Sequence, residues 1–380
     1  MRSTELGPNQ DLIGRRGSRK LLNAPALILD LDAFERNMAR MSDSVQRNGL
    51  LLRPHAKAHK SANVARRQVA AGAVGISCAN LDEAEVVADA GVESILVTSP
   101  VGGPAGIERL VGLAARVPDV IATVDDAGYV EALASHAAQM GASLRVLIDV
   151  DVGQHRTGVV DVQGVVDLAR RVKATDALRY SGLQAYYGHL QHVPAYADRR
   201  VVVHRALEKL RLVTQALNSA GLPPEIVSGG GTGTFSIDAD ARVHTELQPG
   251  SYLFMDRQYA AVELTPEHHS PFEQSLFVQT IVVSVNQPDL AVVLGGWKAF
   301  ATEADVPVVA RGAPADTRYR FMGDEHGGLA LPAGSAPLAV GAVVELVPPH
   351  CDPTVNLFSR FHCVRGDDLV DIWPIEARGY

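Results

Sequence analysis

The chain has 380 residues, of which 47% are hydrophobic and 21% charged, and its formal net charge at pH 7 is -8. An acidic balance argues against nucleic acid or an anionic membrane as the main partner, because both require a basic face. No run approaches about 18 apolar residues, which excludes a membrane-spanning helix, and three scattered cysteines exclude a disulfide framework. We therefore expect a cytoplasmic protein that binds neither nucleic acid nor a membrane.

From residue 24 to about residue 262, short apolar runs alternate with stretches of helical periodicity. The runs predicted as strands are ALILDL (26–31), LLRPHA (51–56), VGISCA (74–79), SILVTS (94–99), VIATVD (120–125), LRVLIDVDVG (144–153), YSGLQAYYGH (180–189), EIVSGGGTG (225–233) and ELQPGSYLFM (246–255). Strands that alternate with helices indicate a parallel sheet, and about eight such units indicate a (β/α)8 barrel. A doubly wound open sheet is the competing interpretation, but no GxGxxG motif follows the first strand.

Beyond residue 262 the pattern changes to β-rich runs separated by Gly, Pro and Asp turns, such as SLFVQTIVVSVNQ (275–287) and FHCVRGDDLVDIW (361–373). Helical periodicity is weak there, which is typical of an all-β fold. We predict a barrel domain over residues 24–262 and an all-β domain over residues 263–380, with residues 1–23 packed on the latter.

Polar residues that follow the predicted barrel strands are the first candidates for a site, because active sites of these barrels lie at the carboxyl ends of the strands. Lys57 follows LLRPHA and is flanked by His55 and His59. Partial desolvation at such a position lowers the pKa of a lysine and makes its amine a nucleophile; a surface lysine in a loop is the alternative. Arg156 could pair with a carboxylate, stack on an aromatic ring, or form a salt bridge at the barrel rim.

The run SGGGTGTF (228–235) lies late in the predicted barrel. Consecutive glycines let backbone N–H groups approach an anion closely, and Ser228, Thr232 and Thr234 add hydroxyl groups. Barrels often bind phosphate in the loops after their last strands, so we predict an anion site here.

His350 and Asp352 form an HxD pair within VPPHCDPTVN (347–356). On an extended segment, alternate side chains point to the same side. Imidazole with carboxylate suits a divalent ion such as Mn²⁺, Zn²⁺ or Mg²⁺, with water and substrate completing its shell. A histidine that is only hydrogen-bonded within a turn is the alternative.

Several blocks together are similar to one known family. These blocks are APALILDLDAFERNM (24–38), LLRPHAKAHKS (51–61), SGGGTGTF (228–235), ELQPGSYLFMD (246–256) and HCDPTVNL (350–357). They resemble the D-threonine aldolases and 3-hydroxy-D-aspartate aldolases. The resemblance implies an alanine racemase-type (β/α)8 barrel followed by an all-β domain, a homodimer, and two cofactors, pyridoxal 5'-phosphate and a divalent metal.

The resemblance also implies roles for individual residues. Lys57 would form the Schiff base with pyridoxal phosphate, and His192 would act in acid–base chemistry. The cofactor ring would lie near Arg156 and Tyr186, its phosphate would be held by Ser228, Gly231 and Thr232, and the metal would be bound by His350 and Asp352.

The expected reaction is the cleavage of a D-β-hydroxy-α-amino acid to glycine and an aldehyde. The related D-serine and hydroxyaspartate dehydratases, which eliminate to a 2-oxo acid and ammonia, are the alternative. Those dehydratases usually carry histidine and cysteine as metal ligands, so Asp352 favours the aldolase. A pyridoxal phosphate-binding protein without turnover is disfavoured, because such proteins lack the β domain.

Overall fold

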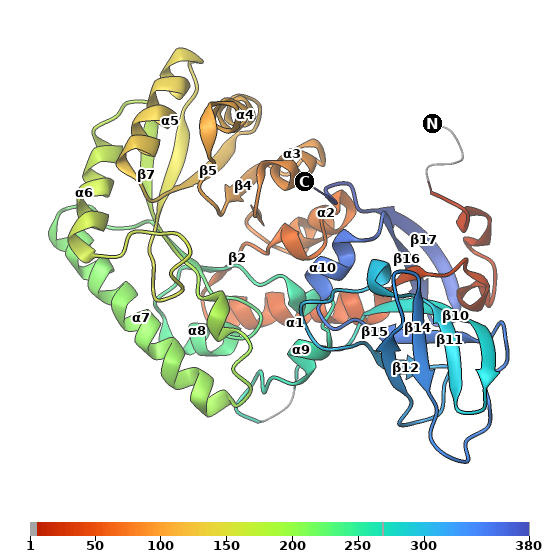
Figure 1. The fold of residues 1–380 in the computed structure, drawn as a ribbon. Coiled ribbons are helices and arrows are strands. Elements are labelled where there is room, and N and C mark those ends of the chain that lie inside the picture. Colours follow the sequence, from red (N-terminus) through yellow and green to blue (C-terminus); the bar gives the residue numbers. More distant parts are fainter. Residues whose placement is uncertain (1–5, 268–269, 380) are drawn as a thin grey trace.

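The computed structural model describes residues 6–267 and 270–379. Figure 1 shows two parts, a ring of helices around parallel strands and a β-rich part, coloured mostly blue, that packs beside α1 and α2. None of the helices in these ranges combines the length and apolarity that crossing a bilayer requires.

Within the described ranges, eight parallel strands form one sheet in the order β2-β9-β8-β7-β6-β5-β4-β3. Their bounds are β2 (Leu51–Leu52), β3 (Ile76–Cys78), β4 (Ser94–Val97), β5 (Asp119–Val124), β6 (Leu144–Asp149), β7 (Leu178–Ala185), β8 (Ile226–Gly229) and β9 (Glu246–Leu247). A parallel bridge between His55 and Ser77 joins the two outer strands and closes the sheet. The predicted (β/α)8 barrel is confirmed.

Helices cover the outside of this barrel. They are α1 (Leu31–Arg47), α2 (Ala62–Ala70), α3 (Leu81–Asp89), α4 (Gly103–Arg116), α5 (Ala127–Gln139), α6 (Val162–Lys173), α7 (Tyr196–Ser219) and α8 (Phe235–Ala241). Several begin at an N-cap carboxylate or amide, such as Asp30, Asn80 and Asp126, whose side-chain oxygen accepts a backbone N–H of the first turn. Apolar faces of strands β3–β8 and of the helices packed on them bury one core, whereas α1, β2 and β9 contribute to a second core that they share with the nine-stranded sheet.

The second sheet has nine strands within the described ranges, in the order β11-β14-β13-β12-β15-β10-β1-β16-β17. Their bounds are β1 (Ala26–Asp30), β10 (Leu276–Gln287), β11 (Leu290–Leu294), β12 (Val308–Arg311), β13 (Arg318–Phe321), β14 (His326–Ala330), β15 (Val343–Val347), β16 (Arg360–Arg365) and β17 (Asp368–Pro374). The predicted all-β fold of the C-terminal part is confirmed.

Short helices make the connections. The α-helical ones are α9 (Arg257–Ala260) and α10 (Cys351–Asn356), and the 3-10 helices are η1 (Gln10–Leu12), η2 (Ser18–Leu21), η3 (Ala56–Ala58), η4 (Gly188–Leu190), η5 (Ser251–Leu253) and η6 (Trp297–Ala299). Helix α10 leaves the nine-stranded sheet and packs against η3 at the mouth of the barrel.

The interpretation of residues 26–31 as the first barrel strand was wrong. Strand β1 pairs antiparallel with β10 and parallel with β16, so it belongs to the nine-stranded sheet. Its four leading residues are fully buried, and an apolar run buried on both faces fits either sheet. The upstream segment also contacts this sheet, since Gly14 N donates to Leu369 O at 2.8 Å and Arg19 Nε donates to Glu345 Oε1 at 2.7 Å. The domain boundary at residue 262 stays a prediction.

A buried ion pair lies inside the barrel. Arg53 Nε donates to Glu246 Oε1 at 2.9 Å, and the two side chains are 4% and 1% exposed. Arg53 Nη1 also donates to Ser94 Oγ at 2.8 Å, and Ser228 Oγ donates to Glu246 Oε1 at 2.6 Å. The pair therefore ties β2, β4, β8 and β9 together through charged groups that water does not reach.

We expect Arg53→Met to lower the free energy of unfolding by about 3–5 kcal/mol, because it leaves the buried Glu246 carboxylate without its counter-charge. Urea denaturation followed by circular dichroism would measure the change. Arg109→Met is the matched control, since Arg109 is 46% exposed and pairs with Asp82 at the surface, where such pairs contribute about 1 kcal/mol or less. Equal effects of the two substitutions would contradict the expectation.

Candidate active site

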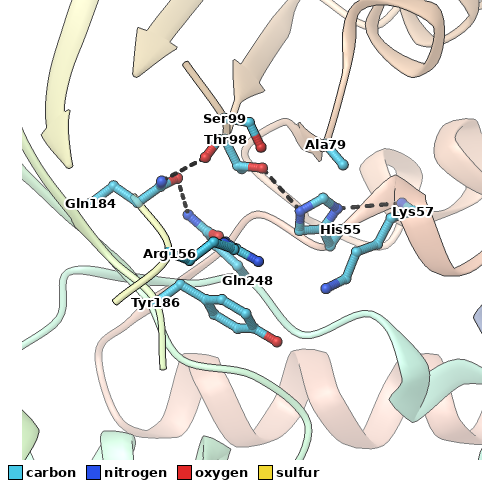
Figure 2. A pocket seen from close by; sticks show the side chains of 9 residues that line it. All are labelled: His55, Lys57, Ala79, Thr98, Ser99, Arg156, Gln184, Tyr186 and Gln248. Atoms are coloured by element: carbon cyan, nitrogen blue, oxygen red, sulfur yellow. Dashed lines mark hydrogen bonds between the residues drawn. The ribbon is translucent and has the colours of Figure 1, made fainter. Parts of the chain in front are cut away.

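A pocket opens at the carboxyl ends of the barrel strands (Figure 2). It is lined by His55, Lys57, Ala79, Thr98, Ser99, Arg156, Gln184, Tyr186 and Gln248. Three predicted site residues, Lys57, Arg156 and Tyr186, thus meet in one place although up to about 130 residues separate them along the chain.

Lys57 lies in η3, directly after β2, and its side chain extends toward Tyr186 in Figure 2. Its Nζ is 5.1 Å from the centroid of the Tyr186 ring, and the guanidinium carbon of Arg156 is 5.6 Å from the same centroid. The Tyr186 phenol raises the pKa of Lys57 most, burial opposes it, and Asp352 raises it further. The expected lowering of this pKa was wrong, because acidic neighbours outweigh desolvation.

His55 holds the backbone of Lys57 in place. The amide N of Lys57 donates to His55 Nδ1 at 3.3 Å, and His55 Nε2 lies 3.2 Å from Thr98 Oγ1. A backbone N–H can only donate, so Nδ1 is the acceptor and the imidazole proton sits on Nε2. The Thr98 hydroxyl in turn donates to Cys78 O at 3.1 Å. Burial, and then the charge of Lys57, lower the pKa of His55 well below its ordinary value, so His55 is a neutral support.

The hydroxyl of Ser228, one of the predicted phosphate ligands, is already engaged by two other side chains. Ser228 is fully buried at the end of β8. Its hydroxyl donates to Glu246 Oε1 at 2.6 Å and accepts from Gln248 Nε2 at 2.7 Å. These contacts turn the hydroxyl into the barrel interior, where it supports the strand end and is poorly placed for a phosphate.

Thr232 and Gly231 lie in the following turn. The backbone N of Gly231 donates to Thr234 Oγ1 at 3.2 Å, which draws this amide inward. The hydroxyl of Thr232 accepts from the backbone N of Tyr252 at 3.0 Å. An accepting hydroxyl keeps its own proton for a further partner, so Thr232 retains a donor for an anion at this loop.

A buried carboxylate supports the loop from behind, and the sequence did not single it out. Asp238 accepts hydrogen bonds from the hydroxyl groups of Tyr187 and, at 2.7 Å, Thr234. Burial raises the pKa of Asp238 to about 7. At Gly230, which has φ +67°, an added Cβ would lie 2.4 Å from Asp238 Oδ2, so this position requires glycine both for its backbone and for its space.

Gln191 links the loop after β7 to the glycine loop. Its Oε1 accepts from Gly233 N at 2.9 Å, and its Nε2 donates to Thr234 Oγ1 at 3.2 Å. The next residue is His192, the predicted acid–base group. The sequence analysis named His192 but not Gln191, because a glutamine in a short run does not show which distant groups it will contact.

His350 and Asp352 lie at the start of α10, so the argument from an extended segment was wrong. His350 is the extended N-cap residue, and Asp352 stands in the first helical turn. His350 Nδ1 lies 2.7 Å from Glu303 Oε1, and Ser251 Oγ donates to Asp352 Oδ1 at 3.1 Å. Among the residues that the structure describes, no three His, Cys, Asp or Glu side chains gather to hold a metal ion. A two-ligand metal site therefore stays a prediction.

His192 lies beside this pair. The centroid of its ring is 6.4 Å from that of His350 and 4.5 Å from that of Tyr259. Burial, and then His350, lower the pKa of His192 to about 4, while Asp352 acts in the opposite direction and Lys57 in the same one. His350, Asp352 and Lys57 thus each lie close enough to His192 to shift its pKa.

Asp256 fastens the HxD segment to the barrel. Its carboxylate accepts the backbone N–H groups of Tyr259 and Cys351, each at 2.8 Å, and the side chain is fully buried. The backbone N of Arg257 also donates to Pro348 O at 3.1 Å. Two backbone donors from separate segments converge on one carboxylate, so Asp256 sets where His350 and Asp352 lie relative to His192.

Comparison with known proteins agrees with this arrangement. Residues 29–258 match the family model "Alanine racemase, N-terminal domain", and residues 275–364 match "Putative serine dehydratase domain". The 3-hydroxy-D-aspartate aldolase of Paracoccus denitrificans (strain Pd 1222) is 37% identical, over 94% of this chain and 92% of that protein. The crystal structure of D-threonine aldolase from Filomicrobium marinum is 40% identical with a TM-score of 0.91, covering 95% of this chain and 96% of that one. The chain belongs to this aldolase family.

A dehydratase is also related to this aldolase-family chain, at a greater distance. The D-threo-3-hydroxyaspartate dehydratase of Delftia sp. (strain HT23) is 28% identical, over 93% of this chain and 97% of that protein. Both reactions therefore occur among relatives that match nearly the whole chain.

For this aldolase-family protein we expect Asp256→Ala to lower the free energy of unfolding by at least about 2 kcal/mol, because two buried backbone donors lose their acceptor. Asp161→Ala is the matched control, since Asp161 is an exposed N-cap whose carboxylate accepts from Gly164 N at 2.7 Å, and losing such a cap costs about 1 kcal/mol. Urea unfolding of both variants would measure the difference. A smaller effect for Asp256→Ala than for Asp161→Ala would contradict the fastening role.

Proposed function

We propose that the protein is a pyridoxal phosphate- and divalent-metal-dependent aldolase that cleaves D-β-hydroxy-α-amino acids to glycine and an aldehyde. The observation that carries the proposal is the meeting of a lysine, a neutral histidine and an HxD pair at one barrel mouth. Lys57 comes from the segment after β2, His192 from the segment after β7, and His350 with Asp352 from the start of α10, which follows β15 of the nine-stranded sheet. A homodimer and a cytoplasmic location remain part of the proposal.

The pocket residues fit pyridoxal phosphate. Lys57 offers a primary amine, and Arg156 and Tyr186 offer a cation and an aromatic face around the space beside it. Thr232 offers a hydroxyl at the glycine loop. Bound pyridoxal phosphate accepts the electron pair released when a bond to Cα of the substrate breaks. The chain itself would hold the cofactor and orient the amino acid beside Lys57.

The HxD pair fits a divalent ion such as Mn²⁺, Mg²⁺ or Zn²⁺. No residue in the described ranges forms a hydrogen bond with His350 Nε2 or Asp352 Oδ2, while the other polar atom of each side chain is engaged. Imidazole nitrogen with carboxylate oxygen is a donor set that such ions accept. A metal held there would lower the pKa of a nearby hydroxyl group.

His192 would take the proton of the substrate β-hydroxyl. Its pKa of about 4 keeps the imidazole neutral at physiological pH, so it can accept a proton. The aldolase relatives resemble this chain more than the dehydratase does, at 37% against 28% identity, which favours carbon–carbon cleavage over dehydration.

Product analysis tests the reaction. We expect the purified protein with pyridoxal phosphate and Mn²⁺ to convert D-threonine or a D-3-hydroxyaspartate isomer to glycine and an aldehyde, with no product from L-threonine. Chromatography of derivatised amino acids measures glycine, and an enzymatic assay measures ammonia. Formation of ammonia and a 2-oxo acid in place of glycine would assign the protein to the dehydratases.

Replacement of the lysine tests the cofactor attachment. Lys57→Arg keeps a positive charge beside Tyr186 but removes the primary amine that a covalent bond to pyridoxal phosphate requires. We expect borohydride reduction followed by peptide mass spectrometry to find a pyridoxyl group on residue 57 of the wild type and none on the variant, whose activity falls to background. Lys298→Arg, at an exposed lysine paired with Glu325, should keep the label; a labelled Lys57→Arg protein would refute the assignment.

A further inference from the structure

One polar atom of each HxD side chain is already held by a neighbour. Glu303 Oε1 lies 2.7 Å from His350 Nδ1, and Asp352 Oδ1 accepts from Ser251 Oγ at 3.1 Å. The remaining polar atoms, His350 Nε2 and Asp352 Oδ2, have no hydrogen-bond partner among the described residues. The hydrogen bonds at Nδ1 and Oδ1 thus orient both side chains and leave Nε2 and Oδ2 available to bind a cation.

The contact with Glu303 decides which tautomer of His350 is present. A carboxylate oxygen only accepts, so His350 Nδ1 carries the proton in this hydrogen bond. A neutral imidazole protonated on Nδ1 has its lone pair on Nε2. Histidines that bind metals commonly donate their second ring N–H to a carboxylate in this way, which fixes the ring and makes the ligating nitrogen more basic.

The segment that carries Glu303 is anchored to α10 by its backbone. Ala301 N donates to Thr354 Oγ1 at 3.0 Å, and the Thr354 hydroxyl donates to His350 O at 2.7 Å. Thr354 is fully buried. Because one hydroxyl ties the Glu303 segment and the His350 backbone together, the carboxylate and the imidazole keep their relative positions.

We propose that Glu303 is a positioning residue that orients His350 for a divalent cation. The inference rests on the metal site of the proposed function. Glu303 would act only through the imidazole, by holding the Nδ1 proton and turning Nε2 toward the cation. Ser251 holds Asp352 in the corresponding way.

A simple surface ion pair between the same residues is the competing explanation, and it makes a different prediction. The side chains of Glu303 and His350 are 52% and 25% exposed, and an exposed pair contributes about 1 kcal/mol or less to stability. Loss of Glu303 should therefore barely change thermal stability in either case. Only the positioning role requires that cation affinity changes.

The experiment measures Mn²⁺ binding to the pyridoxal phosphate-loaded protein by isothermal titration calorimetry. We expect Glu303→Ala to raise the dissociation constant for Mn²⁺ by about 10–100-fold, with unchanged melting temperature and unchanged cofactor content. Glu303→Gln should lose less affinity than Glu303→Ala, because the amide oxygen can still accept from His350 Nδ1. His350→Ala serves as the reference for loss of the ligand itself.

Asp305→Asn is the matched control, because Asp305 lies two residues further along and pairs with Arg257 at 2.6 Å. This substitution removes a negative charge from the same segment and leaves the contact between Glu303 and His350 intact. The Mn²⁺ affinity of the variant should therefore stay within about twofold of wild type. An equal loss in Asp305→Asn would mean that overall charge sets the affinity, and would overturn the positioning role.

Two further outcomes separate the inference from the proposal beneath it. If the wild type and Glu303→Ala bind Mn²⁺ equally well, the metal site stands and the role of Glu303 is refuted. If the wild type binds none of Mn²⁺, Mg²⁺ and Zn²⁺, the metal part of the proposed function fails, and the role of Glu303 fails with it.

Discussion

The attachment of α10 to the mouth of the barrel is the constraint on which the candidate site depends. Lys57 belongs to the eight-stranded barrel, whereas His350 and Asp352 leave the nine-stranded sheet, so neither sheet contains the site alone. Asp256 joins them by accepting a backbone N–H from each side of the junction. Two further hydrogen bonds join the barrel to the C-terminal segment: Ser61 Oγ donates to Pro374 O at 2.7 Å, and Ala377 N donates to Lys60 O at 3.0 Å. Backbone groups that are buried and fully paired tolerate little displacement, which fixes distances across the site.

Inside the barrel, buried polar groups form a hydrogen-bonded network that reaches the pocket lining at Thr98, Gln184 and Gln248. The Arg53–Glu246 pair holds Ser228, Gln248 Nε2 donates to Ser228 Oγ, and Gln184 Nε2 donates to Thr98 O at 2.7 Å beneath the pocket. Each member is buried and each has a partner. Satisfied networks of this kind rigidify a core, so the side chains on this side of the pocket are held in fixed positions.

The sequence predicted the parts of the molecule that depend on local pattern, and missed those that depend on distant partners. Alternating apolar and amphipathic runs predicted the barrel, because periodicity records burial. A buried apolar run does not show which strand it pairs with, and β1 was therefore assigned to the wrong sheet. The glycine loop was found from its composition, but the inward hydroxyl of Ser228 depends on Glu246, and the loop's support depends on Asp238. Such hydrogen bonds join residues from different strands and leave no mark in any short run of sequence.

Two ionisable groups of the candidate site, Lys57 and His192, have their pKa values shifted in opposite directions. Tyr186 and Asp352 raise the pKa of Lys57, whereas burial and His350 lower that of His192. When the environment pushes the pKa values of two groups apart, one group acts as the acid and the other as the base. Lys57 holds its proton more tightly than an ordinary lysine and must release it before its nitrogen can attack a carbonyl group, whereas His192 is neutral and can receive a proton. The difference comes from position alone: Lys57 faces a phenol and a carboxylate, while His192 lies desolvated between Tyr259 and another imidazole. In the proposed function His192 would therefore take up the substrate proton, and the junction that brings α10 to the barrel contributes to its low pKa by placing His350 beside it.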